Sequence, residues 1–147
     1  MNEDYHYGAL IGMLSNEIKR SFAGNKNHSL LTGRQGQVLH YIFAQAEVRN
    51  VFQRDIEMDF NIRRSSASSM LANMEKLGVI RRESVSYDAR LKRIVVTEKG
   101  EELKAIVKNE LDEMERQLVK NIPQKDLDVF DDVMHKMIEN LKEENYA

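Results

Sequence analysis

Residues 61–100 constrain the fold more than any other part of the 147-residue chain. They open with apolar side chains that recur every three or four residues, which is the pattern of a helix with one buried face. These side chains are Ala67, Met70, Leu71, Met74 and Leu77. Gly78 follows, and glycine ends helices well because it accepts a left-handed conformation without penalty. Two strand-like segments come next, so the stretch predicts a helix, a stop and a basic β-hairpin.

The opposite side of this predicted helix is built from small, polar side chains. Serine is a poor residue for a helix interior because its hydroxyl competes with the backbone, so the serine run costs helix stability. Small side chains with hydroxyl groups let a helix approach another surface closely and form hydrogen bonds with it, and a DNA groove is one surface that would reward such a face. The face comprises Ser65, Ser69, Ala72 and Lys76, flanked by Ser66, Ser68 and Asn73, and all of these except Lys76 are small or short.

Charge is distributed unevenly along the chain. Residues 61–99 contain nine Lys/Arg against four Asp/Glu, a net charge of +5, whereas residues 100–147 contain seven against thirteen, a net charge of −6. The overall charge of −2 hides this contrast. A basic module of this kind is typical of a phosphate-binding surface. The alternative is a solvated surface whose charges happen to cluster.

Composition excludes several classes of protein. The chain has no cysteine, which excludes disulfides and cysteine-ligated zinc and favours a cytoplasmic location. It has no apolar run of about 18 residues, so we expect no membrane-spanning segment. The acidic start, Met1 to Asp4, lacks the features of a signal peptide. A single proline and abundant Leu, Met, Glu and Lys favour a mostly helical fold.

The segments before the serine-rich helix predict three more helices. Apolar periodicity indicates a first helix over residues 5–22, and Thr32 with Gln35 has the form of a capping box that opens a second helix. A short third helix is predicted over residues 53–60, and Asn61 suits the tight turn that follows it. Two short helices joined by such a turn are the signature of a helix-turn-helix.

After Gly78 the sequence predicts strands over residues 79–84 and 92–97, joined by a loop over residues 85–91 that carries Arg90 at its tip. Thr97 is a good N-cap for a following helix that ends near Asn121. Pro123 then marks the start of a last helix.

The first helix and the last two are long and amphipathic. Their apolar faces together are larger than a small helix-turn-helix module could cover. They could pack on each other as an intramolecular layer. We favour a dimerisation layer, because a helix-turn-helix usually reads two half-sites through a two-fold dimer.

Together these features resemble the MarR family of winged helix-turn-helix regulators over nearly the whole chain. Asp88-x-Arg90 followed by Val96-Thr97-x-x-Gly100 is similar to the family's wing signature. Its second and third helices begin with sequences similar to Leu31 to Leu39 and Gln53 to Ile56. Its recognition helix resembles Ser66 to Ser69, and the end of that helix resembles Met74 to Ile80. Two departures are Val85-Ser86-Tyr87, where the family often has D-P-x, and Ser69, where a basic residue is common.

The resemblance implies a mainly α fold with a small β-wing, in a single MarR-like domain over residues 1–147. The winged helix-turn-helix lobe that binds DNA is expected at 32–100, and the helical dimerisation region at 1–31 and 101–147. The implied function is a sequence-specific regulator of transcription, expected to be a repressor, that binds a double-stranded DNA operator as a homodimer. A small aromatic or anionic effector could release it.

The resemblance also implies roles for individual residues. The recognition helix and its start would face the major groove and neighbouring phosphates. Arg90 would enter the minor groove, and Asp88 would orient the wing without touching DNA. Lys92 and Arg93 are candidates for phosphate contacts. The full set of predicted DNA-binding residues is Arg63, Arg64, Ser65, Ser66, Ser68, Ser69, Asn73, Arg90, Lys92 and Arg93.

Other functions find little support in the sequence. No catalytic constellation is present, so we expect no enzyme, and no cofactor is predicted. The four histidines lack metal-binding spacing, although His40 with Glu17 or His28 is a conceivable zinc site. Candidate residues for lining an effector pocket are Tyr5, Tyr7, Arg20, His40 and Tyr41. The main alternative function is a winged-helix module that binds protein without specific DNA binding.

Overall fold

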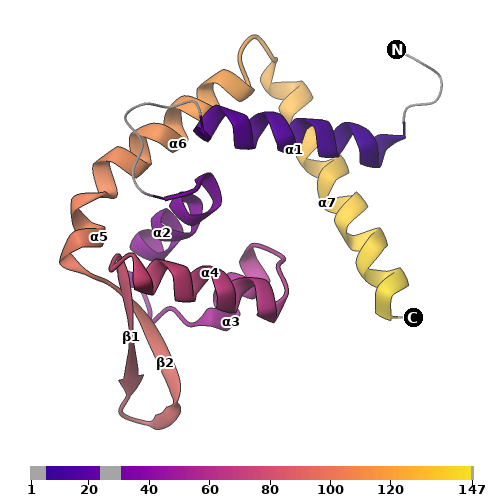
Figure 1. Ribbon diagram of the computed structural model, residues 1–147. Helices are drawn as coiled ribbons and strands as arrows, with labels where there is room; N and C mark the ends of the chain where they lie inside the picture. Colours follow the sequence, from indigo (N-terminus) through magenta and orange to yellow (C-terminus); the bar gives the residue numbers. More distant parts are fainter. Residues whose placement is uncertain (1–5, 24–30, 147) are drawn as a thin grey trace. The chain divides into compact units, whose positions relative to one another are not determined.

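The computed structural model describes residues 6–23 and 31–146, which form helices and one two-stranded antiparallel sheet (Figure 1). In chain order the elements are α1 (Tyr7–Ala23), α2 (Gly33–Ala46), α3 (Gln53–Asp59), α4 (Arg64–Lys76), β1 (Ile80–Val85), β2 (Asp88–Val96), α5 (Glu98–Glu102), α6 (Lys104–Leu118) and α7 (Gln124–Tyr146). The chain forms two compact units, Met1–Met114 and Glu115–Ala147. The predicted fold class, mainly helical with a small β-wing, is confirmed.

Local sequence chemistry sets the ends of the helices in the first unit. Thr32 caps α2 as predicted, because its side chain accepts a hydrogen bond from the Gln35 N–H while the Gln35 side chain accepts one from the Thr32 N–H. Asn61 adopts φ 50° in the turn between α3 and α4. Gly78 adopts φ 77° directly after α4, as a glycine at a helix end should.

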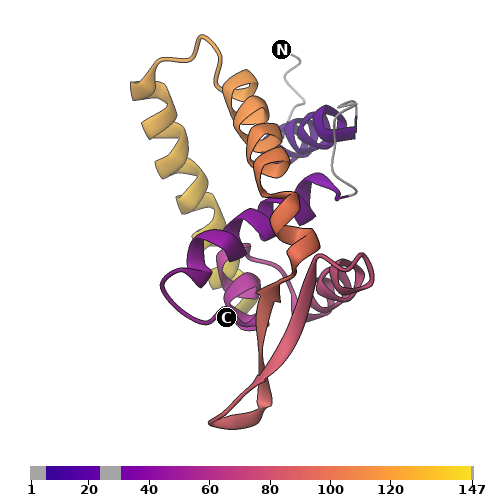
Figure 2. The same cartoon turned by 90° about the vertical axis from the view of Figure 1, so that its left-hand side faces the viewer.

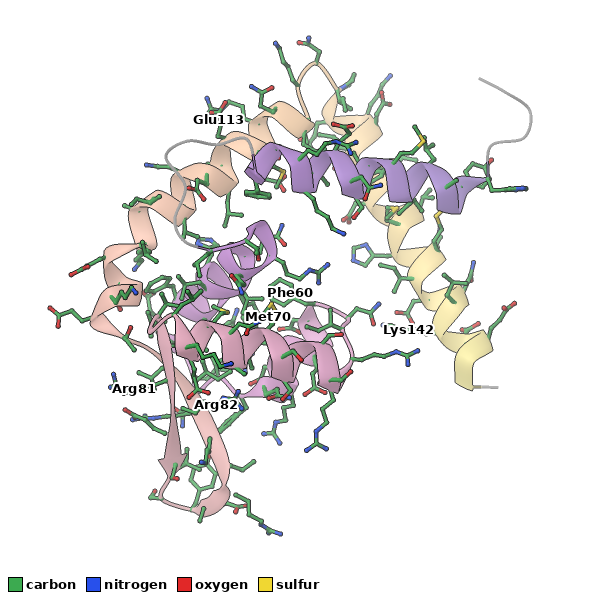
Figure 3. The ribbon with its side chains drawn as sticks, viewed as in Figure 1. Phe60, Met70, Arg81, Arg82, Glu113 and Lys142 are labelled. Carbon is green, nitrogen blue, oxygen red and sulfur yellow. The ribbon has the colours of Figure 1, made fainter. Side chains whose placement is uncertain are left out.

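The core of the first unit lies between α2, α3, α4, the wing and α6. Its side chains come from every one of these elements, and α2 contributes the most. Phe60 and Met70 are partly buried and pack against it (Figure 3). The buried members are Leu31, Val38, Leu39, Ile42, Phe43, Val51, Ile56, Leu71, Met74, Val79, Ile80, Ile94 and Val107. The predicted buried stripe of the serine-rich helix is confirmed, with Ala67, Leu71 and Met74 fully inaccessible.

Two predictions about element boundaries were wrong. The predicted loop over residues 85–91 is a two-residue turn, Ser86-Tyr87, because β2 begins at Asp88. Arg90 therefore lies within a strand and not at a loop tip. The single helix predicted after Thr97 is divided at Leu103 into α5 and α6, where the Leu103 N–H bonds to the Gly100 carbonyl three residues back. The predicted first helix begins at Tyr7, and Tyr5 lies outside the described residues.

The second unit is dominated by α7, a 23-residue helix. None of the side chains described for residues 115–144 is buried. Its apolar row stays accessible, with Val129, Phe130 and Leu141 each more than half exposed. In the first unit, α1 also shows accessible apolar side chains, among them Tyr7, Leu10, Ile11 and Leu14. No helix in the described part of the chain is long and apolar enough to cross a membrane.

Candidate nucleic-acid interface

Helix α4 presents two contrasting faces. Its apolar side is buried in the core, whereas its serine side is open to solvent. All five small polar residues predicted to contact DNA are exposed: Ser65, Ser66, Ser68, Ser69 and Asn73. From Ser65 to Asn73 the exposed face thus carries short, uncharged side chains, and this part of the helix can approach base edges without a long side chain in the way.

The start of α4 is basic and open. Arg63 occupies the N-cap position with an extended backbone, and its side chain makes no capping hydrogen bond. Arg63 and Arg64 are both exposed, and among the described residues neither forms an ion pair. Both guanidinium groups are therefore available to phosphate.

The end of α4 is tied to the segment that leaves the wing. The Gly78 and Val79 N–H groups bond back to the Glu75 and Met74 carbonyls, which closes the helix. Lys99 Nζ donates to the Leu77 carbonyl at 2.7 Å, and the Thr97 hydroxyl donates to the Gly78 carbonyl. The orientation of the predicted recognition helix is consequently linked to the end of β2 and the start of α5.

The wing is a hairpin that projects beyond α3 and α4 (Figures 1 and 2). Its register pairs Arg82 with Ile94 and Ser84 with Lys92, and an irregularity between Ser84 and Val85 precedes the turn. The Ile94 N–H also bonds to the Val51 carbonyl at 2.7 Å, which attaches the base of the wing to the connection before α3. Alternation along paired strands places Arg82, Lys92 and Arg90 on one face of the wing.

Asp88 stabilises the backbone beside Arg90. Its Oδ1 atom accepts the Arg90 N–H at 2.9 Å and lies 3.4 Å from Arg90 Nε. Asp88 is half-buried, whereas the Arg90 side chain is 92% exposed. This arrangement is compatible with the predicted roles, an orienting carboxylate and an arginine free to leave it for DNA, and the roles themselves stay predictions.

The other face of the wing is neutralised by a carboxylate. Glu83 accepts from Arg81 Nε at 2.8 Å and from Arg93 Nη2 at 2.8 Å. Hydrogen bonds from Arg81 and then Arg93 lower the pKa of Glu83. Arg93 thus lies on a different face of the wing from Lys92, and its guanidinium is already paired with Glu83. A phosphate contact by Arg93, as predicted, would have to share that guanidinium with Glu83.

A basic groove about 420 Å³ in volume lies between the N-terminal ends of α3 and α4 and the first face of the wing. It brings together three predicted residues, Arg64, Arg90 and Lys92, with two that the sequence analysis missed, Arg54 and Arg82. Glu57 is the carboxylate that also lines it. The missed residues come from α3 and β1, and no local motif marks them.

Arg82 links the wing to α4. Its Nε atom lies 2.9 Å from Glu75 Oε1, although the N–H does not point at the carboxylate closely enough for a hydrogen bond. Figure 3 shows Arg82 on the side of β1 towards α4 and Arg81 on the opposite side. The pair joins β1 to the last turn of α4.

A polar network holds α3, which with seven residues is too short to be stable alone. The Tyr41 hydroxyl of α2 donates to the Asp59 carboxylate and accepts from Arg49 Nη2 at 3.1 Å. Arg49 also pairs with Asp55 at 3.0 Å, and Asp55 caps α3 by accepting the Phe52 N–H at 2.8 Å. Burial, followed by the bond to Asp59, raises the pKa of Tyr41. Both ends of α3 are therefore fastened.

The described residues contain no cluster of three His, Cys, Asp or Glu side chains that could hold a metal ion. His28, one member of the conceivable zinc site, lies outside the described residues. The described surface places cations on α3, α4 and the wing beside the exposed serine side chains of α4.

Comparisons with known proteins agree with this geometry. A MarR family model matches residues 31–91. The chain is similar to S. aureus MepR, whose structure was solved in complex with DNA, with 27% sequence identity and a TM-score of 0.80. The alignment covers 93% of this chain and 99% of the MepR chain. The transcription regulator MarR from Oenococcus oeni PSU-1 is 25% identical, covering 91% and 99%, with a TM-score of 0.74. A comparison with curated protein sequences gave no match.

The matched segment spans the helix-turn-helix and most of the wing, and the structural likeness extends over nearly the whole length of both chains. The family and the fold are those of transcription regulators and not of enzymes. Residues 31–91 thus match the MarR family, and nearly the whole chain shares the winged-helix fold of solved MarR-family transcription regulators.

Proposed function

We propose that this protein is a sequence-specific repressor that binds a double-stranded DNA operator as a homodimer in the cytoplasm. The observation that carries the proposal is the exposed serine face of α4 beside the basic groove and the exposed Arg90 of the wing. A small uncharged face suits base edges in the major groove, and surrounding cations suit phosphates. The MepR relative, whose structure is a complex with DNA, supports the same use of the fold.

The test is binding of the purified protein to duplexes selected from random DNA. We expect the logarithm of the association constant to fall linearly with the logarithm of salt concentration, by several phosphate equivalents. We also expect selected duplexes to bind far more tightly than random ones. If the protein is not retained on duplex DNA at low salt, the alternative of a protein-interaction module becomes the better interpretation.

The homodimer part of the proposal relies on the accessible apolar rows of α1 and α7. Phe130 is 52% and Leu141 65% exposed, and both lie on one side of α7 at helical spacing. Large apolar side chains in such a row are usually covered by another surface. A second copy of this chain would cover them, as the dimeric reading of paired half-sites requires.

Phe130→Ala is expected to raise the dissociation constant of the dimer by about tenfold or more, the effect of losing roughly 1.4 kcal/mol of interface energy. Asp132→Ala, a truncation on the other side of α7, is the matched control and should leave dimerisation unchanged. Sedimentation equilibrium measures both constants. Equal dimer stability in Phe130→Ala, Leu141→Ala and the parent protein would contradict the assignment of α7 to the dimer.

The first unit contains a candidate binding site for a small effector that would release the protein from DNA. A cavity of about 560 Å³ lies between α1 and α2, with apolar walls from Ile18, Phe22 and Leu31. Lys19 and Arg34 also line it, so an apolar, anionic compound matches its chemistry. The four described residues among the earlier candidates, Tyr7, Arg20, His40 and Tyr41, do not line this cavity.

We therefore expect benzoate derivatives to bind the protein and to weaken its complex with DNA. Arg34→Gln should weaken benzoate binding by about tenfold, because it removes the charge partner of the carboxylate. Lys125→Gln, which removes a cation from α7, should change it little. Isothermal titration calorimetry measures the affinities, and equal binding by the parent and Arg34→Gln proteins would exclude this site.

A further inference from the structure

The basic groove differs from the rest of the wing in the balance of its charges. Five of its lining residues are cationic and come from four elements, whereas the opposite face of the wing pairs each cation with Glu83. Arg82 is engaged by Glu75 and Arg90 by Asp88. Among the described residues, no ion pair involves Arg54, Arg64 or Lys92. Glu57 also lines the groove, so Glu57, Glu75 and Asp88 offset at most three of the five cations, and the groove keeps a net positive charge.

Arg54 is the cation of this groove whose position the structure explains best. Its guanidinium carbon lies 5.3 Å from the centre of the Phe52 ring, where the negative face of the ring attracts it. Phe52 is itself buried, and its N–H is fixed by Asp55 at the start of α3. Arg54 is exposed to solvent above this ring. A guanidinium held in place on a rigid platform loses little entropy when it binds an anion.

The surroundings indicate what kind of anion the groove takes. Arg64 is the first residue of α4, and Arg90 and Lys92 lie on the wing, so the cations extend from the proposed major-groove reader to the proposed minor-groove reader. A DNA strand that passes from a major to a minor groove presents consecutive phosphates between those two readers. A single small anion would use only some of these cations.

We propose that the basic groove holds the sugar–phosphate backbone of one DNA strand between α4 and the wing, with Arg54 as a phosphate-contact residue. The inference rests on the proposed function and goes beyond the recognition helix and wing tip, because it assigns a DNA contact to α3. Arg82, held by Glu75, is then a positioning residue that sets the width of the groove.

Arg54→Gln tests the proposal, with Arg81→Gln as the matched control. Both changes remove one exposed guanidinium, but Arg81 lies on the other face of the wing and is paired with Glu83. For Arg54→Gln we expect a loss of affinity of about eightfold per protomer at 0.1 M salt, and a salt slope smaller by about 0.9 per protomer, the contribution of one phosphate. Arg81→Gln should leave the slope unchanged.

The measurement is a fluorescence-anisotropy titration of a duplex selected by the parent protein, at several salt concentrations between about 50 and 200 mM. Arg54→Lys should retain the slope, since it retains the charge, and thermal unfolding should show that all variants are folded. An unchanged slope and affinity in Arg54→Gln would overturn the proposal even though the parent protein binds DNA. Equal losses in Arg54→Gln and Arg81→Gln would also overturn it, because the effect would then be one of net charge.

Two further outcomes distinguish failure of the groove proposal from failure of the proposed function. If the parent protein shows no salt-dependent binding to duplex DNA, the proposed function fails and the groove proposal fails with it. If Arg54→Gln leaves the affinity for the duplex unchanged but abolishes displacement of the duplex by millimolar inorganic phosphate, the groove is a site for free anions and not a seat for the strand.

Discussion

Gly100→Ala is expected to lower the free energy of unfolding by about 3 kcal/mol, at the upper end of the range for overpacking a well-packed site. A Cβ atom at Gly100 would lie 2.3 Å from the Val79 carbonyl oxygen and 2.5 Å from Val96 Cγ1. That carbonyl already accepts the Thr97 N–H at 3.1 Å, and the Thr97 hydroxyl accepts the Gly100 N–H at 3.2 Å. The backbone at this junction cannot move aside without breaking these hydrogen bonds.

Gly36→Ala is the matched control and should have the opposite sign. A Cβ atom there meets Val107 Cγ1 at 3.7 Å, an ordinary contact, and Gly36 lies inside α2. Alanine in a helix interior is more stable than glycine by roughly 0.5–1 kcal/mol. Urea unfolding followed by circular dichroism measures both changes. If the Gly100→Ala protein were as stable as the Gly36→Ala protein, the result would contradict the close packing of α5 against the base of the wing.

Features fixed by local chemistry could be predicted from the sequence. The capping box at Thr32, the left-handed turn at Asn61, the helix end at Gly78 and the N-cap at Thr97 are all confirmed. Each depends on one or two side chains acting on their own backbone, so no distant partner is needed. The buried stripe of α4 was predictable for a similar reason, since helical periodicity alone separates its faces.

Features that depend on pairing between distant residues could not be predicted in the same way. Asp88 indicates a loop by composition, yet it pairs with Val85 and begins β2, because the pairing of β2 with β1 extends as far as Asp88. The division at Leu103 has no glycine or proline at the position itself, and the apolar pattern continues through it. Strand length and this helix break are decided by tertiary contacts that periodicity does not contain.

The candidate site shows the same limit. Arg64, Arg90 and Lys92 were predicted from the resemblance, but Arg54 and Arg82 enter the basic groove only through the packing of α3 and β1. Lys92 and Arg93 are neighbours in sequence with the same charge. The strand places them on different faces, and of the two only Arg93 is paired with Glu83. Charge counting over residues 61–99 therefore predicted the module, and the fold decided which cations remain available.

Arg90→Ala is expected to weaken binding to the operator by more than about tenfold per protomer and to reduce the salt slope by about one per protomer. Arg90 is 92% exposed on the wing, and a guanidinium in a narrow minor groove reads width and potential more than base identity. A·T-rich duplexes outside the operator should lose affinity as well. Ser69→Ala is the comparison: it should cost less, on the order of 1 kcal/mol, and leave the slope unchanged.

Asp88 variants separate orientation from charge at the same place. Asp88 Oδ1 accepts the Arg90 N–H at 2.9 Å, so alanine removes an acceptor that fixes the wing beside Arg90, whereas asparagine keeps an acceptor and removes only the charge. We expect Asp88→Ala to weaken DNA binding towards the level of Arg90→Ala. Asp88→Asn should bind at least as tightly as the parent protein, because a negative charge near phosphate is lost. Anisotropy titrations at matched salt measure both. Tighter binding by Asp88→Ala would show that Asp88 acts only as a repulsive charge, and its orienting role would have to be abandoned.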